Sequence, residues 1–187
     1  MRAAAGVAGR PVIAAHRIGG LARTLGRVER LLIVVASFAL MEPVTAGVHR
    51  WVMHGFGWGL HRSHHRPRPG LLERNDLFPV MFASVTMLAM AVGFRWWGRD
   101  LLVPASVGVT GYGVTYAFVH DVYIHQRVRF GPRVAFLERR KSAHLMHHTR
   151  GEAPYGMLFP VVPARVRTGA SEWSTHVDRA PAADAGA

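Results

Sequence analysis

The sequence predicts an all-α integral membrane protein, a helical bundle with a histidine-rich site for two metal ions that faces the cytosol. Three observations predict this fold class. Half of the 187 residues are hydrophobic and only 18% are charged, against about 25% in ordinary soluble domains. Three long runs are almost uncharged, and ten of the twelve histidines fall in short clusters beside those runs.

The apolar runs are long enough to cross a membrane. They cover residues 31–48, 77–94 and 101–119, and Glu42 is their only charge. Each has 18 or 19 residues, near the roughly 20 that a helix needs to cross the hydrocarbon core. Buried helices of a soluble α-protein are the alternative, but such runs are rare in a soluble domain of this length.

These runs divide the chain into three parts. Residues 1–30 form a basic extension, residues 31–163 the membrane domain, and residues 164–187 a polar, aperiodic tail that we expect to be disordered. Residues 154–163 are apolar but too short to span, so we expect an interfacial or re-entrant cap over the site.

Basic residues predict the topology. Residues 95–100 alone join the second and third runs, so these runs form a tight antiparallel hairpin. The flanking segments 49–76 and 120–152 hold five and seven basic residues, and the positive-inside rule places both in the cytoplasm. The expected location is the inner cell membrane, with several spans and a site that faces the cytoplasm.

The extension 1–30 is at odds with that topology, because it carries six arginines and a complete first span would place it outside. Three explanations are open. Pro43 and Glu42 break the first span into a re-entrant one, the charge rule does not hold for this extension, or the start codon is misassigned.

Composition excludes several classes of protein. The chain has no cysteine, which excludes disulfide frameworks, iron–sulfur clusters and thiol catalysis. Its net charge is +12, but the arginines flank the apolar runs and no helix-turn-helix, RNP or zinc-finger pattern occurs. We therefore expect membrane lipids, and no nucleic acid, as partners of the basic surface.

The histidines form a pattern that occurs twice, on either side of the predicted hairpin. Each copy has a pair spaced H-x4-H and a triplet spaced H-x2-H-H. A step of three or four residues returns to one helical face, so the three rings of a triplet can face one point. We interpret all ten histidines as metal ligands: His49, His54, His61, His64, His65, His120, His125, His144, His147 and His148.

The H-x4-H pairs leave two explanations open. Five residues is a poor step for one face of an α-helix. A π-bulge would bring both histidines onto one face, and such bulges favour functional sites. Alternatively, the two histidines of a pair reach different metal ions.

Ten imidazoles are too many for one ion, and two metals with about five ligands each fit the twofold pattern. Imidazole suits zinc, copper, iron and nickel, whereas a structural zinc site is satisfied by four ligands. We expect two iron ions, because multi-histidine coordination with open positions can bind and reduce O2.

Three carboxylates are candidate partners of the histidines, since a ligating histidine commonly donates its second N–H to a carboxylate. Asp121 lies four residues before His125. Glu42 is a charge inside an apolar run, which marks a functional candidate. Asp76 is the third, and its alternative role is a helix N-cap.

Several motifs are absent. There is no H-E-x-x-H of a zinc protease and no phosphate-binding G-x-x-x-x-G-K-[ST]. Gly55, Gly57 and Gly59 lie between histidines and make no nicotinamide fingerprint, so we expect them to allow close backbone approach. Without a flavin or NAD motif, electrons must come from another protein. A basic cytoplasmic face suits an acidic donor of the ferredoxin type with its reductase.

Three stretches carry the pattern: MEPVTAGVHRWVMHGFGWGLHRSHHRPRPGLLERNDLFPVMFA, GYGVTYAFVHDVYIHQR and AHLMHHTRGE. They resemble the bacterial β-carotene 3-hydroxylases, a branch of the fatty acid hydroxylase superfamily. The resemblance extends over residues 31–163. The linker HGFGWGLH is typical of the carotenoid branch, whereas the related ketolases have a shorter first histidine box.

The resemblance implies a membrane di-iron monooxygenase with the ten histidines as ligands. Such an enzyme uses O2, two electrons and two protons to hydroxylate carbon 3 of a β-ionone ring, converting lipid-dissolved β-carotene to β-cryptoxanthin and then zeaxanthin. Fatty acid hydroxylation or ring ketolation is the alternative reaction, and a membrane metal-binding protein is the non-enzymatic one. The aromatic residues that either line a slot for the ring or only pack are Trp51, Phe56, Trp58, Tyr116 and Phe118.

Overall fold

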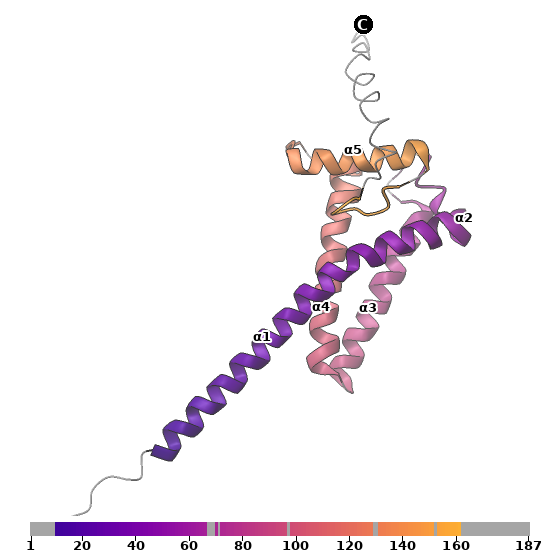
Figure 1. The fold of residues 1–187 in the computed structure, drawn as a ribbon. Coiled ribbons are helices and arrows are strands. Elements are labelled where there is room, and N and C mark those ends of the chain that lie inside the picture. Colours follow the sequence, from indigo (N-terminus) through magenta and orange to yellow (C-terminus); the bar gives the residue numbers. More distant parts are fainter. Residues whose placement is uncertain are drawn as a thin grey trace, which may run out of the picture. The chain divides into compact units, whose positions relative to one another are not determined.

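The computed structural model describes residues 10–66, 70, 72–96, 98–128, 131–151 and 153–161, with side chains from residue 26 onward. Every regular element in this part of the chain is helical, which confirms the predicted all-α class. The elements are α1 (Arg10–Gly47), η1 (Val48–Phe56), α2 (Trp58–His61), η2 (Arg74–Asp76), α3 (Leu77–Arg95), α4 (Arg99–Ala117), η3 (Phe118–Ile124) and α5 (Ala135–Arg150) (Figure 1). The predicted tail lies outside the described residues.

Three helical stretches are long and apolar enough to cross a membrane: Gly26–Phe56, Arg74–Arg95 and Arg99–Ile124. Each contains one predicted run and continues beyond it, because an apolar run marks only the part that lipid can cover. Large apolar side chains on these helices are exposed, with Leu31 at 62% and Val85 at 68%. Exposed apolar surface of this extent marks contact with a membrane, and the chain is a membrane protein.

α1 is not interrupted at Pro43. The helix continues from Arg10 to Gly47 with Pro43 inside it, so the structure has one continuous first helix and no re-entrant break. The boundary that we expect after residue 30 falls within this helix.

The chain divides into two compact units, one of residues 1–39 and 84–111 and the other of residues 40–83 and 112–187. In the first unit, α3 and α4 form the predicted antiparallel hairpin (Figure 1). Gly98 in its turn has φ +76°, a conformation that glycine adopts at no steric cost. A side chain at Gly108 would collide with α1, and such small residues let membrane helices approach closely.

The core of the second unit contains buried histidines as well as apolar side chains. Its buried polar residues are Asn75 and six histidines, His49, His61, His64, His120, His144 and His147; its buried apolar residues are Phe78, Tyr112, Val119, Tyr123, Ile124, Ala143, Met157 and Leu158. Burying a polar group is costly unless it is hydrogen-bonded. Among the described residues, every buried side-chain nitrogen and oxygen has a partner.

Candidate metal centre

The second unit gathers the predicted histidines into two groups. Within each group, the ligand atoms all lie within 4.8 Å of one another. The first group is His49, His54, His61, His65 and His147, and the second group is His64, His120, His125 and His144. The tenth histidine, His148, adjoins the second group, with its Nε2 2.8 Å from Nε2 of His144. Its ring also stacks on that of His65, with centroids 4.3 Å apart, so it lies between the two groups.

The middle histidine of each triplet crosses to the other group. His61 and His65 belong to the first group but His64 to the second, and His147 joins the first group although His144 belongs to the second. The expectation that all three rings of a triplet face one point is therefore wrong. Residues three and four positions after a given residue lie on opposite sides of it around a helix, so one triplet can serve two adjacent sites.

Two π-helices explain the H-x4-H pairs. η1 carries His49 and His54, and η3 carries His120 with His125 directly after it. The His125 N–H donates to the His120 carbonyl at 2.9 Å, a five-residue step that matches the histidine spacing. Each pair belongs to one group. The structure thus agrees with the π-bulge and not with a pair divided between two groups.

Of the three glycines between the first histidines, only Gly57 is required by close approach. A Cβ there would lie 2.8 Å from the Val52 carbonyl oxygen and 3.0 Å from Cζ of Phe78. Nothing lies within 4 Å of the Cβ position at Gly55 or Gly59. Close packing at Gly57 lets the chain turn from η1 into α2, which brings His61 back toward His49.

Neutral oxygens orient two histidines of the first group. Nδ1 of His61 lies 2.7 Å from Oδ1 of Asn75, and Nδ1 of His49 lies 3.1 Å from the Tyr155 carbonyl oxygen. Both oxygens only accept, so each Nδ1 carries the hydrogen and each Nε2 presents a lone pair. The two Nε2 atoms are 3.1 Å apart. Two facing lone pairs cannot hydrogen-bond, and a cation between them satisfies both.

Carboxylates orient two histidines of the second group. Nδ1 of His64 lies 3.0 Å from Oε1 of Glu73, and Nδ1 of His120 lies 2.8 Å from Oδ1 of Asp121. Their Nε2 atoms are 2.9 Å apart. The same reasoning leaves a lone pair on each, so the donor set of both groups fits a metal ion, as in other sites where a partner fixes the histidine tautomer.

Burial favours the neutral form of His61 and His125, which is the form that a metal binds. Burial, followed by the charges of neighbouring histidines, lowers the pKa of His61 to about 3. Burial and the nearby His64 likewise lower the pKa of His125 to about 3. For Glu73, the hydrogen bond from His64 holds the pKa below its ordinary value.

The three predicted carboxylates have different hydrogen-bond partners. Asp121 bonds a histidine, but it is His120 and not His125, since the π-helix changes which residues face each other. Glu42 accepts instead from the Tyr112 hydroxyl at 2.7 Å. Asp76 accepts from the Glu73 N–H at 2.9 Å, so it is the N3 residue of the capping box at η2, and the N-cap itself is Glu73. The expectation of a histidine partner is therefore wrong for Glu42 and Asp76.

Sequence reasoning missed Glu73 and Asn75 as partners of histidines. Asn75 directly precedes Asp76, which the sequence analysis named, but no spacing rule connects Asn75 to His61. Glu73 forms a capping box with Asp76 at η2, and this turn places Glu73 beside His64 and Asn75 beside His61. Contacts of this kind between separate segments cannot be read from residue spacing along the chain.

The segment after α5 covers the first group, where we expect a cap. The Tyr155 ring lies 5.5 Å from the His49 ring and 5.3 Å from the His147 ring. Glu42 holds this segment, because its two oxygens accept the backbone N–H of Leu158 at 3.1 Å and of Phe159 at 2.9 Å. An intramembrane carboxylate thereby anchors the cap.

The five predicted aromatic residues divide into two sets. Trp58 lies 5.3 Å from the His54 ring, and Tyr116 stacks on His120 at 5.2 Å. Trp58 is itself 38% exposed, and the other three are exposed as well, with Trp51 at 68%, Phe56 at 89% and Phe118 at 39%. Trp58 and Tyr116 are thus the two of the five that have ring contacts with the histidine groups.

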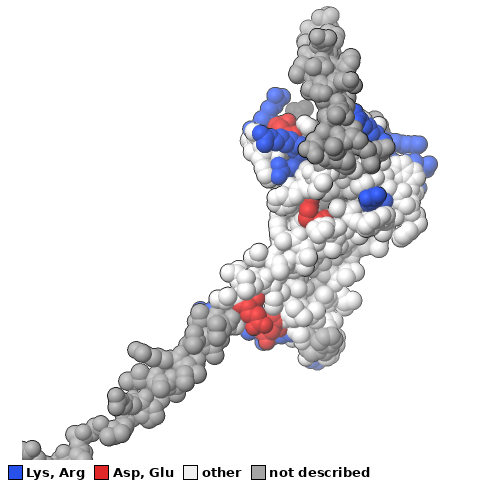
Figure 2. Space-filling view, viewed as in Figure 1, with Lys and Arg blue, Asp and Glu red and all other residues white. Residues whose placement is uncertain are grey.

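Hydrogen bonds of Tyr123, near the end of η3, fix the start of α5. The Tyr123 hydroxyl donates to Oε1 of Glu138 at 2.7 Å and accepts from the Val134 N–H at 2.9 Å. These bonds secure the first turn of α5 and hence the register of His144 and His147. On the face seen in Figure 2, Lys and Arg side chains gather over α5 and the adjoining loops.

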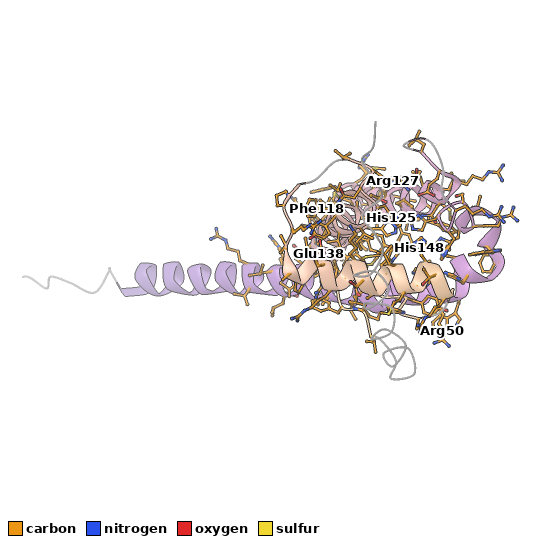
Figure 3. The ribbon with its side chains drawn as sticks, turned by 90° about the horizontal axis from the view of Figure 1, so that it is seen from above. Arg50, Phe118, His125, Arg127, Glu138 and His148 are labelled. Atoms are coloured by element: carbon orange, nitrogen blue, oxygen red, sulfur yellow. The ribbon has the colours of Figure 1, made fainter. Side chains whose placement is uncertain are left out.

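A cavity of about 630 Å³ opens beside the histidines. Its wall includes His64, His65, His125 and His148, together with Arg127. Figure 3 shows His125, Arg127 and His148 next to one another beside α5. This wall gives water and small solutes access to histidines of both groups.

Comparison with known proteins identifies the family. The fatty acid hydroxylase family model matches residues 34–168. A β-carotene hydroxylase of Pseudescherichia vulneris is 42% identical over 139 residues, which cover 71% of this chain and 78% of that protein. A β-carotene hydroxylase of Paracoccus sp. (strain PC1) is 43% identical over 122 residues, 64% of this chain and 74% of that protein. No solved structure matches the chain. Because the family model covers most of its length, the chain belongs to the fatty acid hydroxylase family.

Proposed function

We propose that this protein is a β-carotene 3-hydroxylase of the inner cell membrane. The reaction adds one oxygen atom of O2 to carbon 3 of a β-ionone ring and reduces the other to water with two electrons and two protons. β-Carotene becomes β-cryptoxanthin and then zeaxanthin. The observation that carries the chemistry is the pairing of unprotonated Nε2 atoms, 3.1 Å apart in the first group and 2.9 Å apart in the second.

Two iron ions are the proposed cofactor, one held by each histidine group, with His148 adjoining the second. When bound, iron supplies the activation of O2 that an unactivated C–H bond requires. The protein keeps the imidazoles neutral and orients them through Asn75, Glu73 and Asp121. Trp58 and Tyr155 cover the first group with rings, which excludes water from that side.

The substrate class follows from the relatives and from the surface of the helices. Curated relatives of this chain are named β-carotene hydroxylases, and β-carotene is a hydrocarbon that dissolves in lipid. Exposed aromatic side chains such as Trp51 and Phe56 suit contact with lipid or with a long polyene. The rings of Trp58 and Tyr116 lie 5.3 Å from His54 and 5.2 Å from His120, and we assign the ring of the substrate to their surroundings.

Electrons come from a separate protein in this proposal. The basic side chains over α5 (Figure 2) suit an acidic donor of the ferredoxin type with its reductase. The cavity lined by His125 and His148 then gives an approach to the histidines. By the positive-inside rule this face lies in the cytoplasm.

Pigment analysis tests the proposal. Bacterial cells that accumulate β-carotene receive the wild-type gene or a His144→Ala variant, and carotenoids are separated by chromatography. Wild type should yield β-cryptoxanthin and zeaxanthin, while the variant, present in the membrane at equal amount, should leave β-carotene unchanged.

Other products would change the assignment. Ketocarotenoids would place the protein with the ring ketolases, and hydroxylated fatty acids with unchanged carotene would make it a fatty acid hydroxylase. No product in the presence of a ferredoxin and its reductase, with two irons bound, would favour a membrane metal-binding protein.

A further inference from the structure

Arg127 lies among three carboxylates from two distant parts of the chain. Its Nη1 donates to Oδ1 of Asp76 at 2.8 Å, its Nη2 donates to Oε1 of Glu73, and its Nε lies 3.4 Å from Oδ1 of Asp121. The side chain is 18% exposed. Each of the three guanidinium nitrogens thus faces a different carboxylate.

A tight turn after η3 places this guanidinium. Gln126 has φ 53°, and its side-chain amide donates to the Tyr123 carbonyl at 2.9 Å. The Arg127 N–H donates to the Asp121 carbonyl at 2.9 Å. The chain therefore reverses directly after His125, and the Arg127 side chain is returned toward η3 and η2.

The oxygens that face Arg127 are the same oxygens that orient the second histidine group. Oε1 of Glu73 faces both Arg127 and Nδ1 of His64. Oδ1 of Asp121 faces both Arg127 and Nδ1 of His120. A planar guanidinium fixes the direction of the carboxylates that it binds, which an ammonium does not do.

We propose that Arg127 is a positioning residue for the second group. Through Glu73 and Asp121 it orients the His64 and His120 rings, and so raises the affinity of that group for its metal ion. This inference rests on the proposed function, because it takes each histidine group to hold a metal.

Asp76 separates this role from a merely structural one. It binds Arg127 at 2.8 Å and caps η2 through the Glu73 N–H, but these bonds do not involve a histidine. If Arg127 only joined the turn to η2, Arg127→Met and Asp76→Asn would have equal effects on metal binding, because each breaks the bond between these two residues. The positioning role predicts a large effect for Arg127→Met and a small one for Asp76→Asn.

Iron(II) affinity is the measurement. The purified full-length protein in detergent competes with a chromogenic iron(II) chelator, and His144→Ala identifies the second site by the binding step that it removes. Arg127→Met should weaken that step by about 10–100-fold, the usual cost of losing an outer partner of a ligand. The other step should change by less than about twofold. Arg127→Lys should fall between, and Arg139→Met, an exposed position on α5, should match wild type.

A double variant tests the route through Glu73. If Arg127 acts through this carboxylate, Arg127→Met in a Glu73→Gln background should cost less than about threefold, since coupled residues are not additive. If Arg127→Met leaves both binding steps unchanged, the role of Arg127 is overturned. The same holds if Arg127→Met and Arg127→Lys both weaken the two steps equally and both lose helicity. Either result would leave the proposed function intact. A wild-type protein that binds fewer than two irons would overturn the proposed function as well.

Discussion

In both histidine groups two Nε2 atoms face each other, 3.1 Å apart in the first and 2.9 Å apart in the second. The groups differ in the oxygens that hold the rings. In the first group, the Nδ1 atoms face neutral oxygens, the amide of Asn75 and the backbone carbonyl of Tyr155. In the second group, they face the carboxylates of Glu73 and Asp121. A carboxylate partner makes the opposite nitrogen more basic. Two positions that look equivalent in the repeated sequence pattern are therefore chemically different.

The surroundings of the two groups overlap. The Tyr155 ring covers the first group, and His147 has no exposed surface. The cavity adjoins both groups, since its wall includes His65 of the first group and His64 and His125 of the second. The two positions therefore differ in the oxygens that face their Nδ1 atoms and not in their access to the cavity.

Removing one ligand from either group should have the largest effect. His147→Ala takes a ligand from the first group and His144→Ala one from the second, and each should lower hydroxylation by more than about 100-fold, beyond the cost of losing an outer partner. Product formation per amount of membrane-inserted protein measures this. His16→Ala is the control, because His16 lies outside both histidine patterns. Substantial activity in either ligand variant would count against that assignment.

Exchanging the oxygen partners should reverse the difference between the groups. Glu73→Gln gives the second group a neutral partner and should weaken its iron binding by about 10–100-fold. Asn75→Asp gives the first group a carboxylate and should tighten its binding, by about 3–10-fold, since shape is retained. Competition with an iron chelator measures both. Equal affinities in wild type, or no change in either variant, would remove the distinction.

The pH dependence of stability should be a property that both groups share. Without metal, His61 and His125 stay neutral in the folded protein down to a pKa of about 3, whereas the unfolded chain takes up protons near the ordinary value of 6.5. Because the unfolded state then binds more protons, the free energy of unfolding should fall as pH decreases from 6.5 toward 3.

Denaturant unfolding of the metal-free protein in detergent, at several pH values in that window, measures this loss. His61→Asn should reduce the slope, since one group no longer titrates, and His125→Asn should reduce it by a similar amount. A free energy of unfolding that does not vary across the window would contradict the prediction for both groups.

The smallest effect is expected from Tyr155→Phe. The partner of His49 is the backbone carbonyl of this residue, which phenylalanine retains together with the ring over the first group. Iron affinity should change by less than about twofold. A larger loss would show that the hydroxyl, and not only the backbone and ring, supports the first group.

Much of the fold was predictable because lipid imposes a simple rule. Residues 77–94 and 101–119 are apolar on all sides, and the short connection between them allows only a hairpin. The H-x4-H spacing offered the π-bulge only as one of two explanations, and the structure decided between them. The ends of the helices were not predictable from apolarity, because η1 and η3 continue past the apolar runs.

The candidate site was predictable in its members but not in their arrangement. All ten histidines lie together, yet the exchange of His64 and His147 between the groups depends on how α2 and α5 approach each other. The same holds for Glu73, whose partner His64 is near in sequence but is reached only through the turn at η2. Glu42 looked like a histidine partner and instead holds Leu158 and Phe159.

By itself, the sequence determined that this is a helical membrane protein with ten histidines in a repeated pattern and without an electron carrier motif of its own. Apolar length and residue spacing are local properties, so they can be read along the chain. The tertiary structure alone decided which imidazoles share a site, and that one site has neutral partners while the other has carboxylates tied to Arg127. Those features depend on contacts between segments far apart in sequence, and spacing along a single chain carries no record of them.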